Sequence, residues 1–310
     1  MTGLKIISTG SAAPSKIVSN DDLAKIVETS DEWIKQRTGM SLRHYVTEQE
    51  NHTMLAEKAA RAAIEKSGLD KSDIGAVIVC TVSGDYFSPS AACLIQGRLG
   101  LEKDIIAFDL SAGCSGFIFG LETIRSILIA RGCKAGLVIG AEVLSKKMDM
   151  TDRSTCVLFG DGAAAAVVTL SDSLYSSVIG VDGDEEMIHI KSPDGFIHMD
   201  GQGTYKFAVA TVPKVIEKVV NQAGLTYDEI DHFVLHQANL RIIESIAKKV
   251  KQSMDKFVVN IEKYGNMSAA SVPCVISEKI KSGELKTPAT VLMSAFGAGM
   301  TSAAAIVRIR

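Results

Sequence analysis

GLDKSDIGAVIVC at residues 68–80 recurs as GLTYDEIDHFVLH at residues 224–236. Both copies open on Gly-Leu, carry an isoleucine six residues later and end on an apolar run, at a constant offset of 156 residues. An amphipathic helix precedes each copy, marked by apolar residues at helical spacing: Ala56, Ala59, Ala60, Ala63 and Ile64 in the first, and Val212, Val215, Ile216, Val219 and Val220 in the second. The chain therefore contains one helix–strand unit twice.

Further matches extend this repeat into two halves. Residues 105–109 match residues 257–261, and residues 137–140 resemble residues 291–294. Apolar strands that alternate with helices predict an α/β fold with mostly parallel sheets, covered on both faces. We expect the halves to be residues 1–170 and 171–310. They should pack as one body, because no linker rich in proline, serine or charge lies between them.

Composition excludes several classes of function. A net charge of −3 gives no general attraction to nucleic acid or to an anionic membrane. No charged segment followed by an apolar run opens the chain, and no uncharged apolar stretch approaches the roughly 20 residues that span a bilayer. None of the six cysteines forms a C-x-x-C pair, and the six histidines show no metal-ligand spacing. We expect a cytoplasmic protein with reduced cysteines, no signal peptide and no metal site.

Cys114 is the first candidate for chemistry. An apolar strand is predicted at residues 105–110 and a buried helix at residues 117–130, so the thiol lies in the turn between them. Unpaired N–H groups and the positive end of the helix dipole favour an anion there. We therefore expect a thiol with a low pKa that acts as a nucleophile. A small core cysteine explains the turn equally well, because free cysteine is among the most buried residue types.

The repeat adds two partners for Cys114. His236 lies where a strand ends and a helix begins, and Asn266 occupies the position that matches Cys114 at an offset of 152 residues. In open α/β sheets the chemistry gathers at strand ends, so a duplicated fold would bring all three to one central site. A helix N-terminus would keep His236 neutral. Taken singly, His236 is equally a capping histidine, and Asn266 is more often a turn or cap residue.

The motifs around these residues resemble those of β-ketoacyl-acyl carrier protein synthase III, the condensing enzyme that initiates type II fatty acid synthesis. They are SAGCSGF (111–117), HQANLRI (236–242) and YGNMSAASVP (264–273), and the likeness continues in TSDEWI (29–34), RTG (37–39), PSAAC (89–93), TDR (151–153), FGDGAA (159–164) and AFG (295–297). The resemblance implies a thiolase fold, in which duplicated halves form a five-layered α-β-α-β-α sandwich that works as a homodimer. Elongating synthases resemble a Cys/His/His set instead, and thiolases a Cys/His/Cys set.

The resemblance also implies a mechanism. Cys114 would attack an acyl-CoA, with the backbone N–H groups of Cys114 and Ala298 as the oxyanion hole. Ala298 stands where the family commonly has glycine, and its N–H is kept. Malonyl-acyl carrier protein would then lose CO2, with His236 and Asn266 donating hydrogen bonds to the enolate oxygen and apolar Phe296 beside the malonyl carboxylate. No metal or organic cofactor is implied; coenzyme A enters only as the substrate thioester.

Substrate and partner contacts are carried over in the same way. Trp33 and Arg153 match the pair that sandwiches the adenine of CoA, and Arg37 and Asn239 match residues near the rest of CoA. A basic face, otherwise interpretable as a solvated helix surface, would dock the acidic carrier protein; it consists of Arg241, Lys248 and Lys249. The short glycine pattern at 159–162 is interpreted as a structural turn and not as a phosphate loop.

One departure concerns the primer. The family often has an aromatic residue directly before the proline of the PSAA segment, where it reaches into the acyl pocket of the partner subunit. Here Ser88 precedes Pro89, and Phe87 is displaced by one position. We therefore expect a pocket that accepts primers longer than acetyl, or branched ones.

Two other functions stay open. A specialised relative could transfer acyl groups or make an alkylquinolone-like or polyketide product, although the retained His236 and Asn266 favour decarboxylation. A protein with a decayed site could merely bind the carrier protein, although the complete Cys/His/Asn set argues against it.

Overall fold

Strands from both halves of the chain join in one hydrogen-bonded network, whose two parts form the two sheets of the fold. The computed structural model describes residues 2–191 and 195–310. Within these ranges the strand order is β11-β12-β13-β1-β7-β6-β4-β5, and β8 pairs with the free side of β13. The strands are β1 (Gly3–Ala12), β4 (Ile74–Cys80), β5 (Ile106–Leu110), β6 (Ala135–Glu142), β7 (Gly162–Ser171), β8 (Tyr175–Val181), β11 (His232–Leu235), β12 (Ala289–Gly297) and β13 (Thr301–Ile309).

The sheet is mixed, so the prediction of mostly parallel strands is wrong. β4 pairs in parallel with β5 and β6, and β11 pairs in parallel with β12. However, β7 lies antiparallel to β1 and β6, and β13 lies antiparallel to β8 and β12. Before β13 the cause is the 3₁₀ turn Ala298–Met300, which reverses the chain at once. The longer segment before β7, residues 143–161, contains only short helical turns and no crossover helix. A short parallel contact between β1 and β13 joins the two parts of the sheet.

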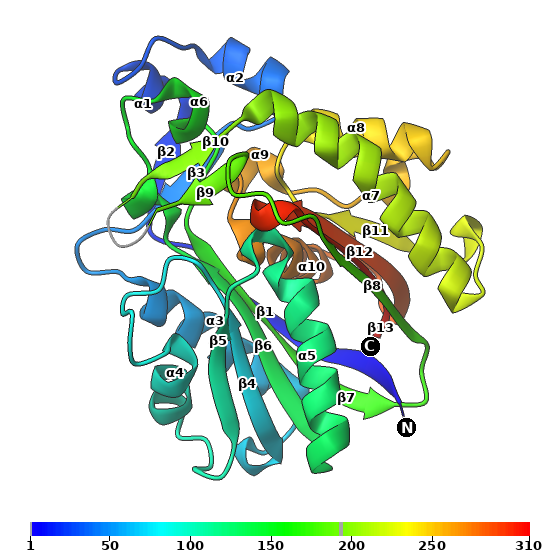
Figure 1. The fold of residues 1–310 in the computed structure, drawn as a ribbon. Helices are drawn as coiled ribbons and strands as arrows, with labels where there is room; N and C mark the ends of the chain where they lie inside the picture. The colour runs from blue at the N-terminus through cyan, green and yellow to red at the C-terminus, as the bar shows by residue number, and fades with distance from the viewer. Residues whose placement is uncertain (1, 192–194) are drawn as a thin grey trace.

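Helices form three layers around these strands, which gives the expected five-layered sandwich (Figure 1). α3 (His52–Ser67) and α4 (Ala91–Leu99) cover one outer face, and α7 (Gly201–Ala223) with α8 (Leu240–Lys249) covers the other. Between the sheets lie α5 (Gly116–Arg131) and α10 (Ser271–Ser282). Strand side chains alternate between layers: in β4, Val77 and Val79 pack in the α3 layer, and Ile78 packs in the α5 layer.

The central helix also explains the one apolar segment long enough to cross a membrane. In the described ranges this segment is Gly113–Arg131. Its side chains Phe117, Leu121, Ile124 and Leu128 are buried in the middle layer. A helix enclosed by two sheets needs an apolar surface on more than one side, so its composition follows from its place in the fold.

The predicted elements around Cys114 are confirmed within one residue at each boundary. The strand is β5, the helix is α5, and a 3₁₀ turn at Gly113–Ser115 lies between them. Residues 257–261, the expected counterpart of β5, are not a strand. They make a single bridge between Phe233 and Phe257, and the N–H of Asn260 then donates to the Gln237 side chain instead of to a neighbouring strand. The division of the chain near residue 170 stays a prediction.

Shorter elements assemble over the carboxyl ends of the central strands (Figure 1). They are α1 (Asn20–Ala24), α2 (Asp31–Thr38), α6 (Arg153–Cys156), α9 (Ile261–Tyr264), and the strand pairs β2 (Lys16–Ser19) with β3 (Leu42–Tyr45) and β9 (Ile188–Ile190) with β10 (Ile197–Met199). The turn at 159–162 is structural, as predicted. Its Asp161 carboxylate accepts hydrogen bonds from the backbone of Val46 and of Ser145, each at 2.8 Å.

Candidate active site

Cys114, His236 and Asn266 line one cavity of about 160 Å³. Cys114 follows β5, and His236 follows β11. Asn266 lies between α9 and the turn that leads into α10. Phe296 and Gly297, at the end of β12, complete this reactive end of the cavity. Three positions that span 152 residues of sequence, from 114 to 266, therefore meet at the carboxyl ends of the central strands, where the repeat places them.

The thiol of Cys114 is not the low-pKa group expected from the sequence. Burial raises its pKa to about 12, although the Ser268 hydroxyl acts in the opposite direction. The expectation considered only the helix N-terminus, whereas enclosure by the surrounding layers disfavours the thiolate more strongly. At neutral pH the ligand-free protein therefore holds Cys114 as a thiol, and nucleophilic attack requires removal of its proton.

Two backbone N–H groups lie close together beside Cys114. A Cβ added at Gly297 would lie 2.7 Å from the Cys114 nitrogen, so only glycine permits this approach of β12 to the turn. A Cβ added at Gly113 would lie 3.2 Å from the Ala298 nitrogen. The nitrogens of Cys114 and Ala298 thus both lie where the end of β12 packs on the Cys114 turn, the place where the resemblance puts the oxyanion hole.

His236 is neutral, as expected, but the physical cause differs. Burial lowers the pKa of the imidazole to about 3. The ring lies edge-on to Phe296, with centroids 5.7 Å apart, and the His236 backbone N–H donates to Ser294 O at 2.8 Å. Enclosure by apolar groups, and not the helix N-terminus, keeps the imidazole uncharged. A neutral imidazole can donate one hydrogen bond without carrying a charge.

Asn266 is oriented by its own loop. Its backbone bonds to Leu158 O and Gly160 N at 2.9 Å each, and its Oδ1 accepts from the Ser268 N–H at 2.8 Å. Because the oxygen end of the amide faces Ser268, the NH2 end is the one available to a ligand. The turn at 159–162, which carries no chemistry itself, thus positions this donor.

The buried neutral His236 makes stability depend on pH. Its folded-state pKa lies below the ordinary value of 6.5, so the unfolded chain binds more protons between pH 6.5 and 3, and stability falls as the pH falls through this window. We expect His236→Gln to lose this dependence. Relative to wild type, the variant should be roughly 3 kcal/mol more stable at pH 4.5 than it is at pH 8. The reason is that wild type loses about 1.4 kcal/mol of unfolding free energy for each pH unit below 6.5.

Urea unfolding of both proteins between pH 8 and 4.5 measures this shift. The value at pH 8, where His236 is neutral in both states, gives the effect of repacking alone. Burial raises the pKa of Glu142 to about 7, which acts with the opposite sign, but Glu142 is common to both proteins. A difference between wild type and variant that stays constant with pH would contradict the assignment of His236 as a buried neutral base.

Trp33 and Arg153 come together at the surface, from α2 and α6. The Arg153 guanidinium lies 5.2 Å from the centroid of the Trp33 ring, and its Nη1 donates to Glu28 O at 2.9 Å. A flat ring between two such groups needs a separation of about 7 Å, twice a van der Waals contact. The pair is therefore closed in this structure, and Arg153 has to move away from Trp33 to admit a nucleobase.

We expect Trp33→Ala to weaken the use of CoA thioesters. Loss of a stacking and cation–π surface should raise KM for acyl-CoA about 5- to 30-fold, equivalent to about 1–2 kcal/mol, with little change in kcat. A truncated acyl-pantetheine without the nucleotide is the control substrate, and its kinetics should be the same for wild type and variant. An equal loss on both substrates would show that Trp33 acts on the fold and not on the nucleotide.

Asn239 and Arg37 lie side by side between the cavity and this pair. The Asn239 side chain donates to Arg37 O at 3.0 Å and accepts from the Arg241 N–H at 2.9 Å, so it caps α8 and ties it to α2. Asn239 also lines the cavity, whereas the Arg37 side chain is exposed. Asn239 thus connects the cavity wall to the end of α2 that carries Arg37.

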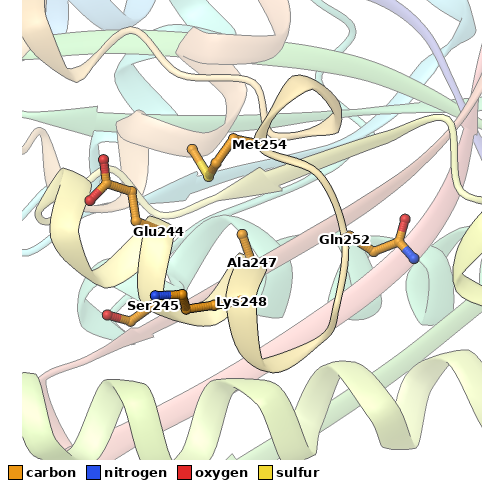
Figure 2. Close-up of a pocket in the computed structure, with 6 residues that line it drawn as sticks. All are labelled: Glu244, Ser245, Ala247, Lys248, Gln252 and Met254. Atoms are coloured by element: carbon orange, nitrogen blue, oxygen red, sulfur yellow. The ribbon is translucent and has the colours of Figure 1, made fainter.

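The expected docking face lies on α8. Arg241, Lys248 and Lys249 are all exposed, and Lys249 Nζ donates to Val209 O of α7 at 2.7 Å. Figure 2 shows a second hollow here, of about 420 Å³, formed by residues of α8 and of the segment after it: Glu244, Ser245, Ala247, Lys248, Gln252 and Met254. Because Glu244 lies on the exposed side of the same helix, the face is less purely basic than its lysines suggest.

Phe87 and Ser88 are not brought to the cavity. Both lie in an exposed loop after β4, and Phe87 is fully exposed in the single chain. Neither contributes to the lining of the cavity around Cys114 within the described residues. Any role in an acyl pocket must therefore be in that of a second chain.

Sequence reasoning missed several residues of the site. Glu142, the last residue of β6, is fully buried, and its Oε2 accepts hydrogen bonds from Thr81, Val82 and Ser83. A lone carboxylate at the end of the apolar run AGLVIGAE was the available signal. Residues on other elements that line the cavity gave no local signal; they are Leu158, Ile188, Met199, Thr204 and Tyr205.

Comparisons with known proteins agree with this site. Residues 108–183 match the 3-oxoacyl-[acyl-carrier-protein] synthase III family model, and residues 220–309 match the model of its C-terminal part. The β-ketoacyl-[acyl-carrier-protein] synthase III of Clostridium beijerinckii is 42% identical over 99% of each chain. The solved structure of 3-oxoacyl-[acyl-carrier-protein] synthase III from Aquifex aeolicus superposes with a TM-score of 0.94 at 42% identity, covering 99% of this chain and 100% of that one.

A solved priming β-ketosynthase of the R1128 polyketide pathway has the same TM-score at 31% identity, covering 99% of this chain and 96% of that one. Near-complete coverage of both chains and the higher identity to the synthase III enzymes decide the assignment. The chain belongs to the 3-oxoacyl-[acyl-carrier-protein] synthase III family of condensing acyltransferases.

Proposed function

We propose that this enzyme condenses an acyl-CoA primer with malonyl-acyl carrier protein to give 3-oxoacyl-acyl carrier protein, CoA and CO2, the reaction that initiates type II fatty acid synthesis. The observation that carries the proposal is the cavity that Cys114, His236 and Asn266 share. Membership of the synthase III family supports the same reaction.

In the first half-reaction Cys114 attacks the thioester carbonyl of the primer, and CoA leaves. The N–H groups of Cys114 and Ala298 stabilise the tetrahedral oxyanion. The acyl group is then held on sulfur, so one difficult condensation becomes two easier steps.

In the second half-reaction the malonyl thioester loses CO2, and negative charge develops on its carbonyl oxygen. His236 and Asn266 each supply one neutral donor to this oxygen, and Phe296 keeps water from the departing carboxylate. The carbanion attacks the acyl carbon on Cys114 and releases the product. The proposed chemistry requires no metal and no organic cofactor.

Intact mass spectrometry after mixing with several acyl-CoAs tests the first step and the choice of primer together. A covalent acyl adduct on Cys114, followed by CO2 release when malonyl-carrier is added, supports the proposal. We propose that longer or branched primers react at least as well as acetyl-CoA, because Ser88 replaces the aromatic residue before Pro89. A strict preference for acetyl-CoA would reject this part.

Arg241, Lys248 and Lys249 are proposed as the docking face for the carrier protein. Exposed cations around the hollow on α8 suit an acidic partner, mainly by raising the association rate at low salt. Lys248→Glu should raise KM for malonyl-carrier and remove most of its salt dependence. Lys58→Glu makes the same charge change on the exposed side of α3, on the opposite outer face, and should have no effect.

A homodimer is proposed from the free side of β5. This strand ends the sheet, and each of its residues is only half-buried in the single chain. The neighbouring loop exposes Tyr86 and Phe87. An unprotected edge strand beside exposed aromatic residues is a favourable surface for pairing with a second copy. Sedimentation velocity that gave only monomer at micromolar concentration would reject the dimer.

Operation in the cytoplasm is also proposed, because the cysteines are unpaired in the described chain.

The similarity to a polyketide-priming synthase favours one alternative, a role in secondary metabolism. Release of CO2 and formation of a 3-oxoacyl product with the carrier protein of fatty acid synthesis would support the leading function. Product formation with a different carrier alone would support the alternative.

A further inference from the structure

Glu142 is a buried carboxyl group that the mechanism above does not use. It lies at the end of β6 with no exposed surface. Its hydrogen bonds involve one oxygen, Oε2, which accepts from Thr81 at 3.3 Å, from the Val82 N–H at 3.2 Å and from Ser83. The other oxygen, Oε1, is buried and has no hydrogen-bond partner within the described chain. A buried carboxylate oxygen without a partner is costly, so it calls for a functional explanation.

Ser268 stands between this carboxyl group and Cys114. The turn that carries it packs tightly on β6: a Cβ at Gly140 would lie 2.3 Å from Ala269 O. The Ser268 hydroxyl is close enough to both groups to lower the pKa of the Cys114 thiol and of the Glu142 carboxyl. Its oxygen is buried and has no hydrogen-bond partner in the described structure, so the hydroxyl has to turn to bond to either group. Ser268 holds this place with a positive φ of 46°, a strained conformation for a residue with a side chain.

Cys114 has few ways to lose its proton. His236, the obvious base, is held neutral and weakly basic by burial, with a pKa of about 3. Other titratable groups near Glu142 are Cys80 at the end of β4, Asp109 of β5, and His52, whose ring bonds to Ala141 O. The Ser268 hydroxyl interacts with the Cys114 thiol and with the Glu142 carboxyl group, and so links the two.

We propose that Glu142 receives the proton of the Cys114 thiol through the Ser268 hydroxyl while Cys114 attacks the primer. The S–H bond breaks, Ser268 accepts that proton and passes its own to Glu142 Oε1, and a bond forms between sulfur and the acyl carbon. The bond between CoA sulfur and the acyl carbon breaks, and the departing CoA thiolate regains the proton by the same path. Glu142 is thus a positioning residue for the proton, and this role in acylation rests on the proposed function.

The ionisation state of Glu142 suits the role. Burial raises its pKa to about 7, so a substantial fraction is carboxylate at neutral pH and can accept a proton. Proton transfer from Cys114 to Glu142 also keeps a single negative charge among Cys114, Ser268 and Glu142. That charge moves from the carboxylate to the reacting sulfur. A second charge is never added to the buried site, and this avoids the repulsion that raises the pKa of Cys114.

The rate of Cys114 alkylation by iodoacetamide tests the relay without CoA or carrier protein. The rate is followed from pH 5.5 to 9.5 by mass spectrometry of the peptide that contains Cys114. We expect the wild-type rate to rise with pH and to level off above about pH 7. Glu142→Gln should react about 10- to 100-fold more slowly at pH 7.5 and should lack the inflection near pH 7.

A purely electrostatic effect of Glu142 on Cys114 predicts the opposite change in the alkylation rate of Glu142→Gln. If Glu142 acts only by repulsion, its neutralisation lowers the pKa of the thiol, and Glu142→Gln reacts as fast as wild type or faster; this result would overturn the relay. Ser268→Gly removes the hydroxyl and relieves the positive φ, so it should react as slowly as Glu142→Gln. The double variant should be no slower than either single variant, whereas multiplied losses would show two independent effects and reject a shared path.

Ser83→Ala is the matched control. It removes a hydrogen bond on the Oε2 side only, so the inflection should persist and move to higher pH, because one donor that stabilises the carboxylate is lost. If Glu142→Gln does not fold, Ser268→Gly carries the test by itself. Wild-type condensation together with an unchanged alkylation profile in Glu142→Gln would reject the relay alone. A relay profile without any condensation would reject the proposed function alone.

Discussion

Cys114→Ala should form no acyl-enzyme and no 3-oxoacyl product, yet it should still release CO2 from malonyl-acyl carrier protein. Condensation requires a sulfur that holds the primer, and no side chain at this position can replace it. Decarboxylation requires only donors aimed at the enolate oxygen, and His236 and Asn266 are held by β11 and by the turn before α10, independently of the thiol. The two half-reactions are thus expected to separate completely in this variant.

Intact mass after incubation with acyl-CoA, and CO2 release from malonyl-carrier, measure the two halves. Cys93→Ala is the matched control, because Cys93 is an exposed thiol that does not line the cavity. The control should keep both the adduct and the product. An adduct that persists in Cys114→Ala would place the nucleophile elsewhere, and simultaneous loss of CO2 release would show that sulfur also takes part in decarboxylation.

Asn266→Ala should give the complementary result, normal acylation of Cys114 with decarboxylation slowed about 10²- to 10³-fold. The loss corresponds to about 3–4 kcal/mol, the usual effect of removing one preorganised donor from a developing oxyanion. His236→Ala should behave in the same way. Because both donors serve one oxygen, the double variant should lose less than the product of the two single losses.

Single-turnover experiments separate these steps, with acylation followed by mass and CO2 release measured on the preformed acyl-enzyme. Asn266→Asp is a sharper probe than alanine, since an acceptor would then face the enolate, and we expect at least as large a loss. If either alanine variant slowed acylation and decarboxylation equally, its side chain would serve the oxyanion of the first half-reaction or the fold, and the assigned roles would be wrong.

The layers of this fold could be predicted from the sequence because the residues that repeat are apolar and are buried in the core. Ile78 of β4 and Val234 of β11 occupy matched positions at the offset of 156 residues, and both are buried in the middle layer. Strand direction was not predictable in the same way. Whether a connection reverses the chain depends on its length and path, and neither the tight turn before β13 nor the longer segment before β7 leaves a mark in the apolar pattern.

In the site, too, the features set by local sequence were predictable, and those set by tertiary packing were not. Cys114, His236 and Asn266 could be chosen from their places at strand ends, and they do share a cavity. The pKa of Cys114 could not be predicted, because it depends on how completely other layers enclose the thiol. Glu142 escaped attention for a related reason: a carboxylate after an apolar strand is usually at the surface, and here residues 81–83 and the Ser268 turn pack around the end of β6 and bury it.

The closed contact between Trp33 and Arg153 has a spectroscopic consequence. Trp33 is the sole indole of the 310-residue chain, so all tryptophan emission arises beside Arg153, at the place where the resemblance to the family puts the adenine of CoA. Replacement of a guanidinium by a purine against that ring changes the quenching of the excited state. Ordinary steady-state fluorescence of the unlabelled protein can therefore time the arrival and departure of the cosubstrate against the slower covalent steps.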